Sequence, residues 1–304
     1  MGIEDAPSSE AAEGPRSKVD LDFFADVAED LVLLIRELFD SFNSVTLNDF
    51  LQGKKAPLYR ACLARQLDGF QAITALTRAD LGHVAPAYLR PACEEYFWIK
   101  YLNTLQPQDF RDFLLQVANY ENLRGLHAQQ MYIGKKGMKH LGFPTAFINE
   151  ALRRVNSGKQ RISDIGDRLG WPSATESNGG LVGLPSTHWI ANKVSEGKLY
   201  DYLYSATSRH VHFSAGELIR RTEVQADEEI DYMGAGKRSQ RSFFALYWGA
   251  SLLIKTTSES VEGGKESSEP PEGFETRAID IAERLGRHGI PSLFYSHEWR
   301  GAWD

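Results

Sequence analysis

Three side chains that can donate or accept protons recur at four-residue spacing in one polar stretch of the sequence. Tyr204, Ser208 and His212 lie in the segment Lys198–Arg221, KLYDYLYSATSRHVHFSAGELIRR. An α-helix has 3.6 residues per turn, so a step of four residues rotates the side chain by only about 40°. A helix over this whole segment would align the three side chains in a stripe and place Ser208 beside His212.

A polar stripe against an apolar core needs partners, because each unpaired buried polar group costs about 1–3 kcal/mol. Arg90 and Glu94, four residues apart in an earlier helical segment, are the partners that we expect. Two interpretations stay open. The first is a structural network that fixes the helix register. The second is a functional site with catalytic side chains, namely Arg90, Glu94, Tyr204, Ser208 and His212.

Several chemistries do not fit this stripe. A Ser–His pair on one helix lacks the strained turn and the oxyanion donors of serine hydrolases. On a helix, His210 and His212 would point about 200° apart, so they could not share a metal ion. The sequence also has no Cys-x2-Cys or His-x3-His spacing. We therefore expect neither a metal site nor a cofactor.

Apolar residues recur at three- and four-residue steps over most of the chain, as in amphipathic helices. No segment of four or more residues shows the alternation of a strand with turn signals at both ends. The sequence therefore predicts an all-α fold, a single bundle of about eight or nine helices. The expected helical segments are Asp20–Phe42, Ala56–Asp80, Pro86–Tyr101, Pro107–Ile133, Pro144–Arg154, Ile162–Leu169, Thr187–Ser195, Lys198–Arg221, Lys237–Ser258 and Phe274–His288.

Glycine, proline and charged residues mark the expected interruptions. Gly134 should end a helix and be followed by a basic turn over Lys135–Gly142. Trp171–Pro185 is expected to be an irregular loop, and Glu223–Gly236 an acidic linker. Pro91 should kink its helix or mark the true start of that helix.

Composition divides the chain into four parts. Residues 1–19, rich in Pro, Ser and Glu, are expected to be disordered. Residues 20–259 are expected to form the helical domain, residues 260–273 a flexible linker, and residues 274–304 a C-terminal helix and aromatic tail. The tail, Ile290–Asp304, should either fold back onto the body or dock a partner, because it would otherwise expose a large apolar patch.

Charge and apolar runs restrict the partners and the compartment. The net charge of −7 argues against a nonspecific grip on DNA, which requires many Lys and Arg side chains on phosphates. The longest apolar run, Phe243–Ile254, is shorter than the roughly 20 residues that span a bilayer, and the N-terminus lacks the features of a signal peptide. We therefore expect a cytoplasmic protein with no membrane contact, whose Cys62 and Cys93 are reduced.

Short basic clusters could still form a local groove for nucleic acid. The more common structure for each is a solvated face or a helix end. The clusters are Arg153-Arg154, Lys135-Lys136 and Lys237-Arg238 with Arg241.

The spaced motifs resemble those of a bacterial helical family known only as a domain of unknown function. That family carries a Leu-Arg-x3-Glu helix followed by Tyr-Leu, and later Trp, Tyr-Asp and Tyr-x3-Ser-x3-His. The resemblance extends over roughly Asp20–Ile254 and implies an all-helical fold without a settled activity. The matching residues are Leu89, Arg90, Glu94, Tyr101, Leu102, Trp189, Tyr200, Asp201, Tyr204, Ser208 and His212.

The helical pattern is also similar to the HEPN superfamily, many of whose members cleave RNA and pair through helices. Their signature is an Arg, a polar residue and a His four to six residues beyond the Arg. Here the expected His positions after Arg209 hold Ser214, Ala215 and Gly216, and His212 comes too early. An RNA cut would need a base and a cation near the phosphate, which His212 with Arg209 or Arg90 could supply.

Two classes of function follow from these patterns, and the sequence leaves open whether the protein is an enzyme. The first is a defence- or stress-related protein that acts as a metal-independent ribonuclease or senses a ligand. Its partner would be RNA or a small molecule, and the HEPN resemblance implies a homodimer. The alternative is a non-enzymatic scaffold that docks a protein partner through its C-terminal aromatic tail.

Overall fold

The computed structural model describes residues 20–41, 46, 48–49, 52–172, 184–212, 214, 217–218, 222–224, 230–232, 235–264 and 270–292. The expected disordered residues 1–19 therefore lie outside the described residues. So do most of the expected loop Trp171–Pro185 and the tail after Ser292.

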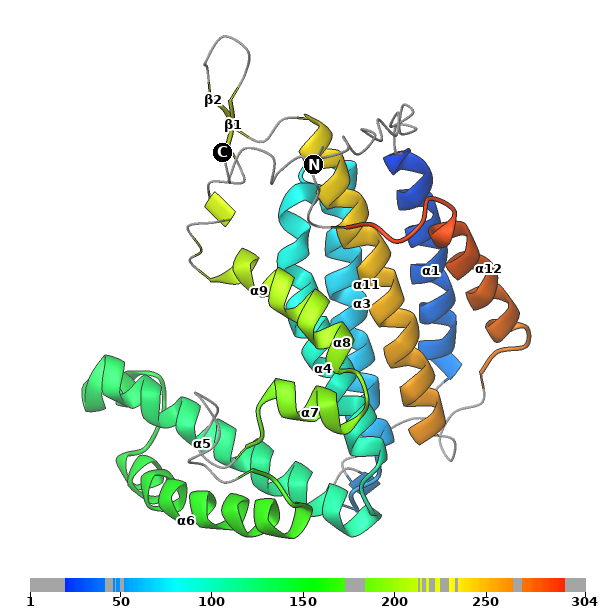
Figure 1. Cartoon of the computed structure of the whole chain (residues 1–304). Coiled ribbons are helices and arrows are strands. Elements are labelled where there is room, and N and C mark those ends of the chain that lie inside the picture. The colour runs from blue at the N-terminus through cyan, green and yellow to red at the C-terminus, as the bar shows by residue number, and fades with distance from the viewer. Residues whose placement is uncertain are drawn as a thin grey trace, which may run out of the picture.

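Five helices run side by side and form the body of the molecule (Figure 1). This arrangement confirms the predicted all-α bundle. The five are α1 (Leu21–Ser41), α3 (Ala56–Arg78), α4 (Leu89–Asn103), α11 (Ala235–Gly263) and α12 (Phe274–Gly286).

Helix α11 lies at the centre of the bundle, as its apolar sequence indicates. It packs against α1, α3, α4 and α12. Its side chains are buried on almost every side, including Phe244, Leu246 and Leu252. A helix that is apolar all round is stable only when other helices cover it, which explains this position. The helix continues to Gly263, past its expected end at Ser258.

Helix α12 packs onto the first helix of the chain. Phe274, Ile281 and Leu285 are buried in the common core. Arg277 pairs with Glu37 of α1 at 2.5 Å, and Arg284 pairs with Asp30 of α1 at 2.9 Å. The two ends of the described chain therefore meet on one side of the bundle (Figure 1).

A short 3₁₀-helix, η1 (Gly82–Tyr88), leads into α4. The expected helix from Pro86 therefore begins at Leu89, and Pro91 lies in its first turn. A proline is tolerated there because the first N–H groups of a helix have no partner within the helix. Gly82 lets η1 approach α11 closely, since a Cβ at this position would lie 2.5 Å from Ser242 Oγ.

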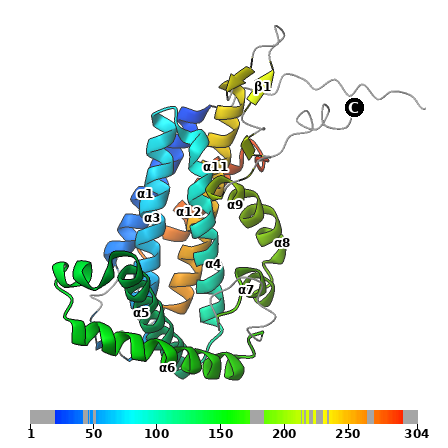
Figure 2. The ribbon, with the colours of Figure 1, turned by 90° about the vertical axis from the view of Figure 1, so that its left-hand side faces the viewer.

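Helices α5 (Pro107–His140) and α6 (Thr145–Leu169) form an antiparallel pair, the α5–α6 arm, at one end of the bundle (Figures 1 and 2). Gly134 has a φ of 71° and breaks the regular helix at the expected position. The expected basic turn Lys135–Gly142 is wrong, because the helix resumes and continues to His140.

The two helices expected at Pro144–Arg154 and Ile162–Leu169 are in fact the single helix α6. Gly158, which lies between the two expected segments, is inside it. A Cβ at Gly158 would lie 3.0 Å from the Tyr120 ring, so the glycine permits a close approach of α5 and α6. Packing between the helices outweighs the helix penalty of glycine, which is about 1 kcal/mol.

The expected acidic linker contains a small antiparallel hairpin. Strand β1 (Thr222–Val224) pairs with β2 (Ile230–Tyr232), with Glu223 opposite Asp231. These three-residue strands are shorter than the segments in which alternation can be recognised in a sequence, and they leave the all-α fold unchanged.

Within the described part of the chain, no helix combines the length and apolar character needed to cross a bilayer. Cys62 is partly buried and Cys93 is buried, and both are free thiols.

Candidate functional site

The helical segment that carries the polar stripe is shorter than expected. It consists of α8 (Gly197–Leu199), a π-helical turn η2 (Tyr200–Tyr204) and α9 (Ser205–Val211) without interruption. The expected continuous helix Lys198–Arg221 is wrong because it is interrupted after Val211, although residues 217–218 are again helical. His212 follows the last turn in an extended conformation, with φ −113° and ψ 157°.

The preceding helix α7 (Thr187–Lys193) begins where the sequence predicts. Ser186 is its N-cap and accepts a hydrogen bond from the backbone N–H of Trp189 at 3.2 Å. Glu196, which lies between α7 and α8, connects this part of the chain to α4 through hydrogen bonds. Its carboxylate accepts hydrogen bonds from Tyr96 at 2.5 Å and from Lys100 at 2.6 Å. Burial works to raise the pKa of Glu196, but these two bonds outweigh it and lower the pKa.

Arg90 of α4 contacts all three side chains of the polar stripe. Its Nη2 donates to Tyr204 Oη at 2.9 Å, and its Nη1 donates to Ser208 Oγ at 3.2 Å. The same Nη1 contacts His212 Nε2. His212 therefore joins the stripe although it lies outside the helix.

Glu94 completes the group one turn further along α4. Tyr204 donates its hydroxyl to Glu94 Oε1 at 2.8 Å, and Arg90 Nε lies 3.7 Å from the same oxygen. The structure thus brings together all five residues singled out in the sequence, here called the Arg90 cluster: Arg90, Glu94, Tyr204, Ser208 and His212.

Most of the donors of Arg90 are used inside the cluster. A guanidinium has five N–H groups and no acceptor. Contacts to Tyr204, Ser208 and His212 engage three of these N–H groups, and Nε lies 3.7 Å from Glu94. A further anion would therefore compete with the partners that Arg90 already has.

Aromatic rings hold the cluster from the other side. The Tyr200 and Tyr204 rings stack with centroids 4.6 Å apart, and the Arg90 guanidinium lies 5.0 Å from the Tyr204 centroid. Burial and the hydrogen bond to Glu94 raise the pKa of Tyr204. The phenol therefore remains protonated and continues to donate to Glu94 at neutral pH.

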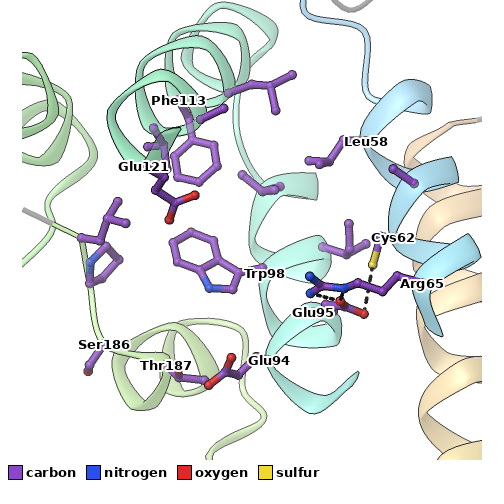
Figure 3. Close-up of a pocket in the computed structure, with 18 of the residues that line it drawn as sticks. Leu58, Cys62, Arg65, Glu94, Glu95, Trp98, Phe113, Glu121, Ser186 and Thr187 are labelled. Carbon is purple, nitrogen blue, oxygen red and sulfur yellow. Dashed lines mark hydrogen bonds and ion pairs between the residues drawn. The ribbon is translucent and has the colours of Figure 1, made fainter. Parts of the chain in front are cut away.

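A pocket of about 840 Å³ opens beside the cluster, between α3, α4, α5 and the start of α7 (Figure 3). Arg90, Glu94 and Tyr204 form part of its wall, whereas Ser208 and His212 do not. Much of the rest is apolar and comes from α4 and α5. These side chains are Trp98, Ile99, Leu102, Phe113, Leu114, Val117 and Ala118.

Sequence reasoning missed the second polar group of this pocket. Arg65 of α3 forms an ion pair with Glu95, and Cys62 donates its thiol to Glu95 at 3.7 Å (Figure 3). Glu95 is only 10% exposed, and its burial raises its pKa despite the opposing Arg65. Burial and the neighbouring Glu95 also raise the pKa of Cys62, so this thiol is unreactive.

Only some of the residues in this second polar group could have been predicted from the sequence. Cys62 and Arg65 are three residues apart and share a face of α3, which helical spacing could have shown. Glu95 follows Glu94 directly, yet the two carboxylates contact different helices. Glu121, which also lines the pocket, belongs to α5 and is placed there only by the packing of the arm.

His210 faces away from the Arg90 cluster. It is buried, and its Nε2 lies 3.4 Å from Glu217. Arg241 of α11 also contacts Glu217 and is buried, so its expected place in a surface basic cluster with Lys237-Arg238 is wrong. Among the described residues, no group of three His, Cys, Asp or Glu side chains is arranged to hold a metal ion.

Comparison with known proteins identifies one family. A family model described as "Family of unknown function (DUF5677)" matches residues 58–230, which is more than half of the chain. The matched region runs from α3 to the hairpin and includes all five residues of the Arg90 cluster. No curated protein and no solved structure matches the chain.

Proposed function

The chain belongs to the family of unknown function DUF5677, and from this premise we propose that the protein binds a small organic molecule in the pocket beside the Arg90 cluster. The observation that carries the proposal is the pocket itself, about 840 Å³ in volume and bordered by Arg90, Glu94 and Tyr204. This volume lies in the range of pockets that bury most of a drug-sized ligand.

The distribution of polar and apolar groups also supports a ligand site. Small-molecule sites combine apolar walls with a few fixed polar groups that orient the ligand. Here Trp98, Phe113 and Val117 supply apolar surface, and the Arg90 cluster supplies polar groups whose positions are already set by hydrogen bonds. Such preorganisation lowers the entropy that a ligand must lose on binding.

The arrangement of helices would let the protein sense its ligand. One wall of the pocket belongs to the α5–α6 arm and the opposite wall to the bundle helices α3 and α4. A ligand that contacts both walls would stabilise one position of the arm relative to the bundle.

Filling the pocket provides the test. In the variant Ala118→Trp, an indole replaces a methyl group on the pocket wall, so we expect small molecules to lose access. Fragments that bind the wild type, detected by ligand-observed NMR, should bind this variant at least about tenfold more weakly, a change of about 1.4 kcal/mol. Melting temperatures of both proteins show whether the variant is folded.

The neighbouring variant Asn119→Trp is the matched control. Asn119 is exposed on the same helix and does not line the pocket, so fragment binding should be unchanged. The proposal is wrong if no fragment binds the wild type, or if fragments bind the folded Ala118→Trp protein as well as they bind the wild type.

The contact between Arg90 and His212 favours a second candidate, a metal-independent ribonuclease. The exposed imidazole could accept the proton of a ribose 2′-hydroxyl, and the adjacent guanidinium would stabilise charge on the phosphate. The existing contacts of Arg90 to Tyr204, Ser208 and His212 weigh against this role, because the phosphate would compete with them.

Total RNA incubated with the wild type and with His212→Ala, without added metal, tests this candidate. A ribonuclease of this kind should cleave RNA, and the folded variant should lose at least about a hundredfold in rate, the usual contribution of a general base. Unchanged cleavage by the variant, or no cleavage by the wild type, contradicts this candidate and leaves the ligand proposal intact.

The scaffold alternative rests mainly on residues 293–304, which lie outside the described residues. The chain just before them contacts the body. The hydroxyl of Tyr202 donates to the carbonyl oxygen of Pro291 at 3.1 Å, and the Trp248 indole N–H does so at 3.5 Å.

A further inference from the structure

The charges that line the pocket do not balance. Three carboxylates, Glu94, Glu95 and Glu121, face two guanidinium groups, Arg65 and Arg90. Arg65 is paired with Glu95, and Arg90 lies beside Glu94. Glu121 is therefore the carboxylate without a matching cation on the pocket wall.

Glu121 is an exposed residue of α5 on the pocket wall. Within the part of the chain that the structure describes, no hydrogen bond or ion pair to the Glu121 carboxylate is formed. Partial desolvation of the carboxylate raises the pKa of Glu121, and the positive charge of Arg124, three residues later on the same helix but outside the pocket wall, opposes this shift. The Glu121 carboxylate points toward the Trp98 indole across the opening (Figure 3).

The positive groups of the pocket are poorly suited to an anionic ligand. Three of the five N–H groups of Arg90 contact Tyr204, Ser208 and His212, and its Nε lies 3.7 Å from Glu94. Arg65 is 72% exposed and pairs with Glu95, so an anion there would compete with an existing carboxylate in contact with water. A ligand carboxylate or phosphate would thus compete with an existing partner at each cation.

The aromatic walls favour the opposite charge. The Trp98 and Phe113 rings pack with centroids 5.3 Å apart and both line the pocket. A cation held over an aromatic face, above all over tryptophan, is attracted by the negative charge density of the ring face. An aromatic wall that faces a carboxylate is a recurring arrangement for amine and quaternary ammonium groups.

We infer that the ligand of this pocket is an organic cation, a molecule with a flat apolar body and a protonated amine or quaternary ammonium group. The apolar body lies against Trp98 and Phe113, and the positive group lies between the Trp98 indole and the Glu121 carboxylate. This inference rests on the proposed ligand-binding function and names the chemical class of the ligand.

Three probes with the same ring system and different charge test it. 5-Fluorotryptamine is a cation at neutral pH, 5-fluoro-3-ethylindole is neutral, and 5-fluoroindole-3-propionic acid is an anion. Binding is measured by ¹⁹F NMR titration. We expect the cation to bind the wild type at least tenfold more tightly than either other probe.

Two variants, each of which removes one carboxylate, show which residue causes the preference for the cation. In Glu121→Gln the affinity for the cation should fall to about that of the neutral probe, because the carboxylate is lost while its shape is kept. In Glu283→Gln, an exposed position on α12 away from the pocket, all three affinities should stay as in the wild type.

Equal binding of cation and neutral probe, or tightest binding of the acid, overturns the inference and leaves the proposed pocket in place. A tenfold preference for the cation that persists in Glu121→Gln overturns the assigned position of the charge. Absence of binding by the cation, while other fragments still bind and are blocked by Ala118→Trp, overturns the inference alone. Failure of those fragments as well overturns the proposed function.

Discussion

The variant Arg241→Met is expected to lower the free energy of unfolding by about 3–5 kcal/mol, the cost of removing one partner from a buried ion pair. The Arg241 and Glu217 side chains are 6% and 4% exposed and contact each other, with His210 at 3.4 Å from the same carboxylate. Removal of the Arg241 guanidinium leaves the buried Glu217 carboxylate without this cation, and water cannot solvate the carboxylate in its place. Urea unfolding followed by circular dichroism measures the loss.

Two further variants make this expectation specific. Arg238→Met removes a guanidinium one turn earlier on the same helix, where the side chain is 40% exposed, and should cost less than about 1 kcal/mol. The double variant Glu217→Leu with Arg241→Met should recover much of the loss, because neither charge then remains buried alone. A similar cost for Arg238→Met and Arg241→Met would contradict this account of the buried pair.

The variant Arg90→Met is expected to cost about 2–3 kcal/mol of stability. It removes the common donor of Tyr204, Ser208 and His212, and hydrogen bonds to charged groups contribute about 1.5–3 kcal/mol. The Arg90 side chain is only 21% exposed, so water replaces these contacts incompletely. Urea unfolding again provides the measurement.

Arg277→Met is the control for the Arg90 cluster. Arg277 pairs with Glu37 across two helices, and both side chains are about half exposed, so its loss should cost no more than about 1 kcal/mol. Equal costs for the two variants would show that the Arg90 cluster holds the fold no more strongly than a surface ion pair does. The cluster would then be retained for another reason.

Local periodicity predicts most of the helices because each needs one face, or in α11 almost every face, covered by apolar packing. The start of α7 at Thr187 is predicted from the sequence, and the longest apolar run, Phe243–Ile254, lies in the helix at the centre of the bundle. Gly158 shows where this reasoning fails. Gly158 permits the close approach of Tyr120 from another helix, and the spacing of residues along one helix cannot predict a contact with another helix.

The residues of the candidate site also divide into those that local spacing predicts and those that only the tertiary structure brings together. The four-residue spacing of Tyr204, Ser208 and Arg90–Glu94 is visible in the sequence because each pair lies on one helix. His212 contacts Arg90 from an extended residue beyond the end of the helix, so helical spacing alone does not account for its position. The carboxylates of Glu95 and Glu121 reach the pocket through the packing of α3, α4 and α5, so only the tertiary structure places them.

The α5–α6 arm also has the mechanics of a lever. Phe113 anchors the arm against Trp98 of α4, and the pocket wall extends from this anchor to Glu121, about 12 Å along the helix at 1.5 Å per residue. Ile133, just before the break at Gly134, lies about 30 Å from the same anchor by the same rise. If the arm turns about Phe113, a displacement at Glu121 is therefore multiplied about two and a half times at Ile133. A small change in the width of the pocket would then produce a larger displacement at the far end of the arm. Met131 and Tyr132 are exposed there, so a molecule in contact with these side chains would be displaced with them.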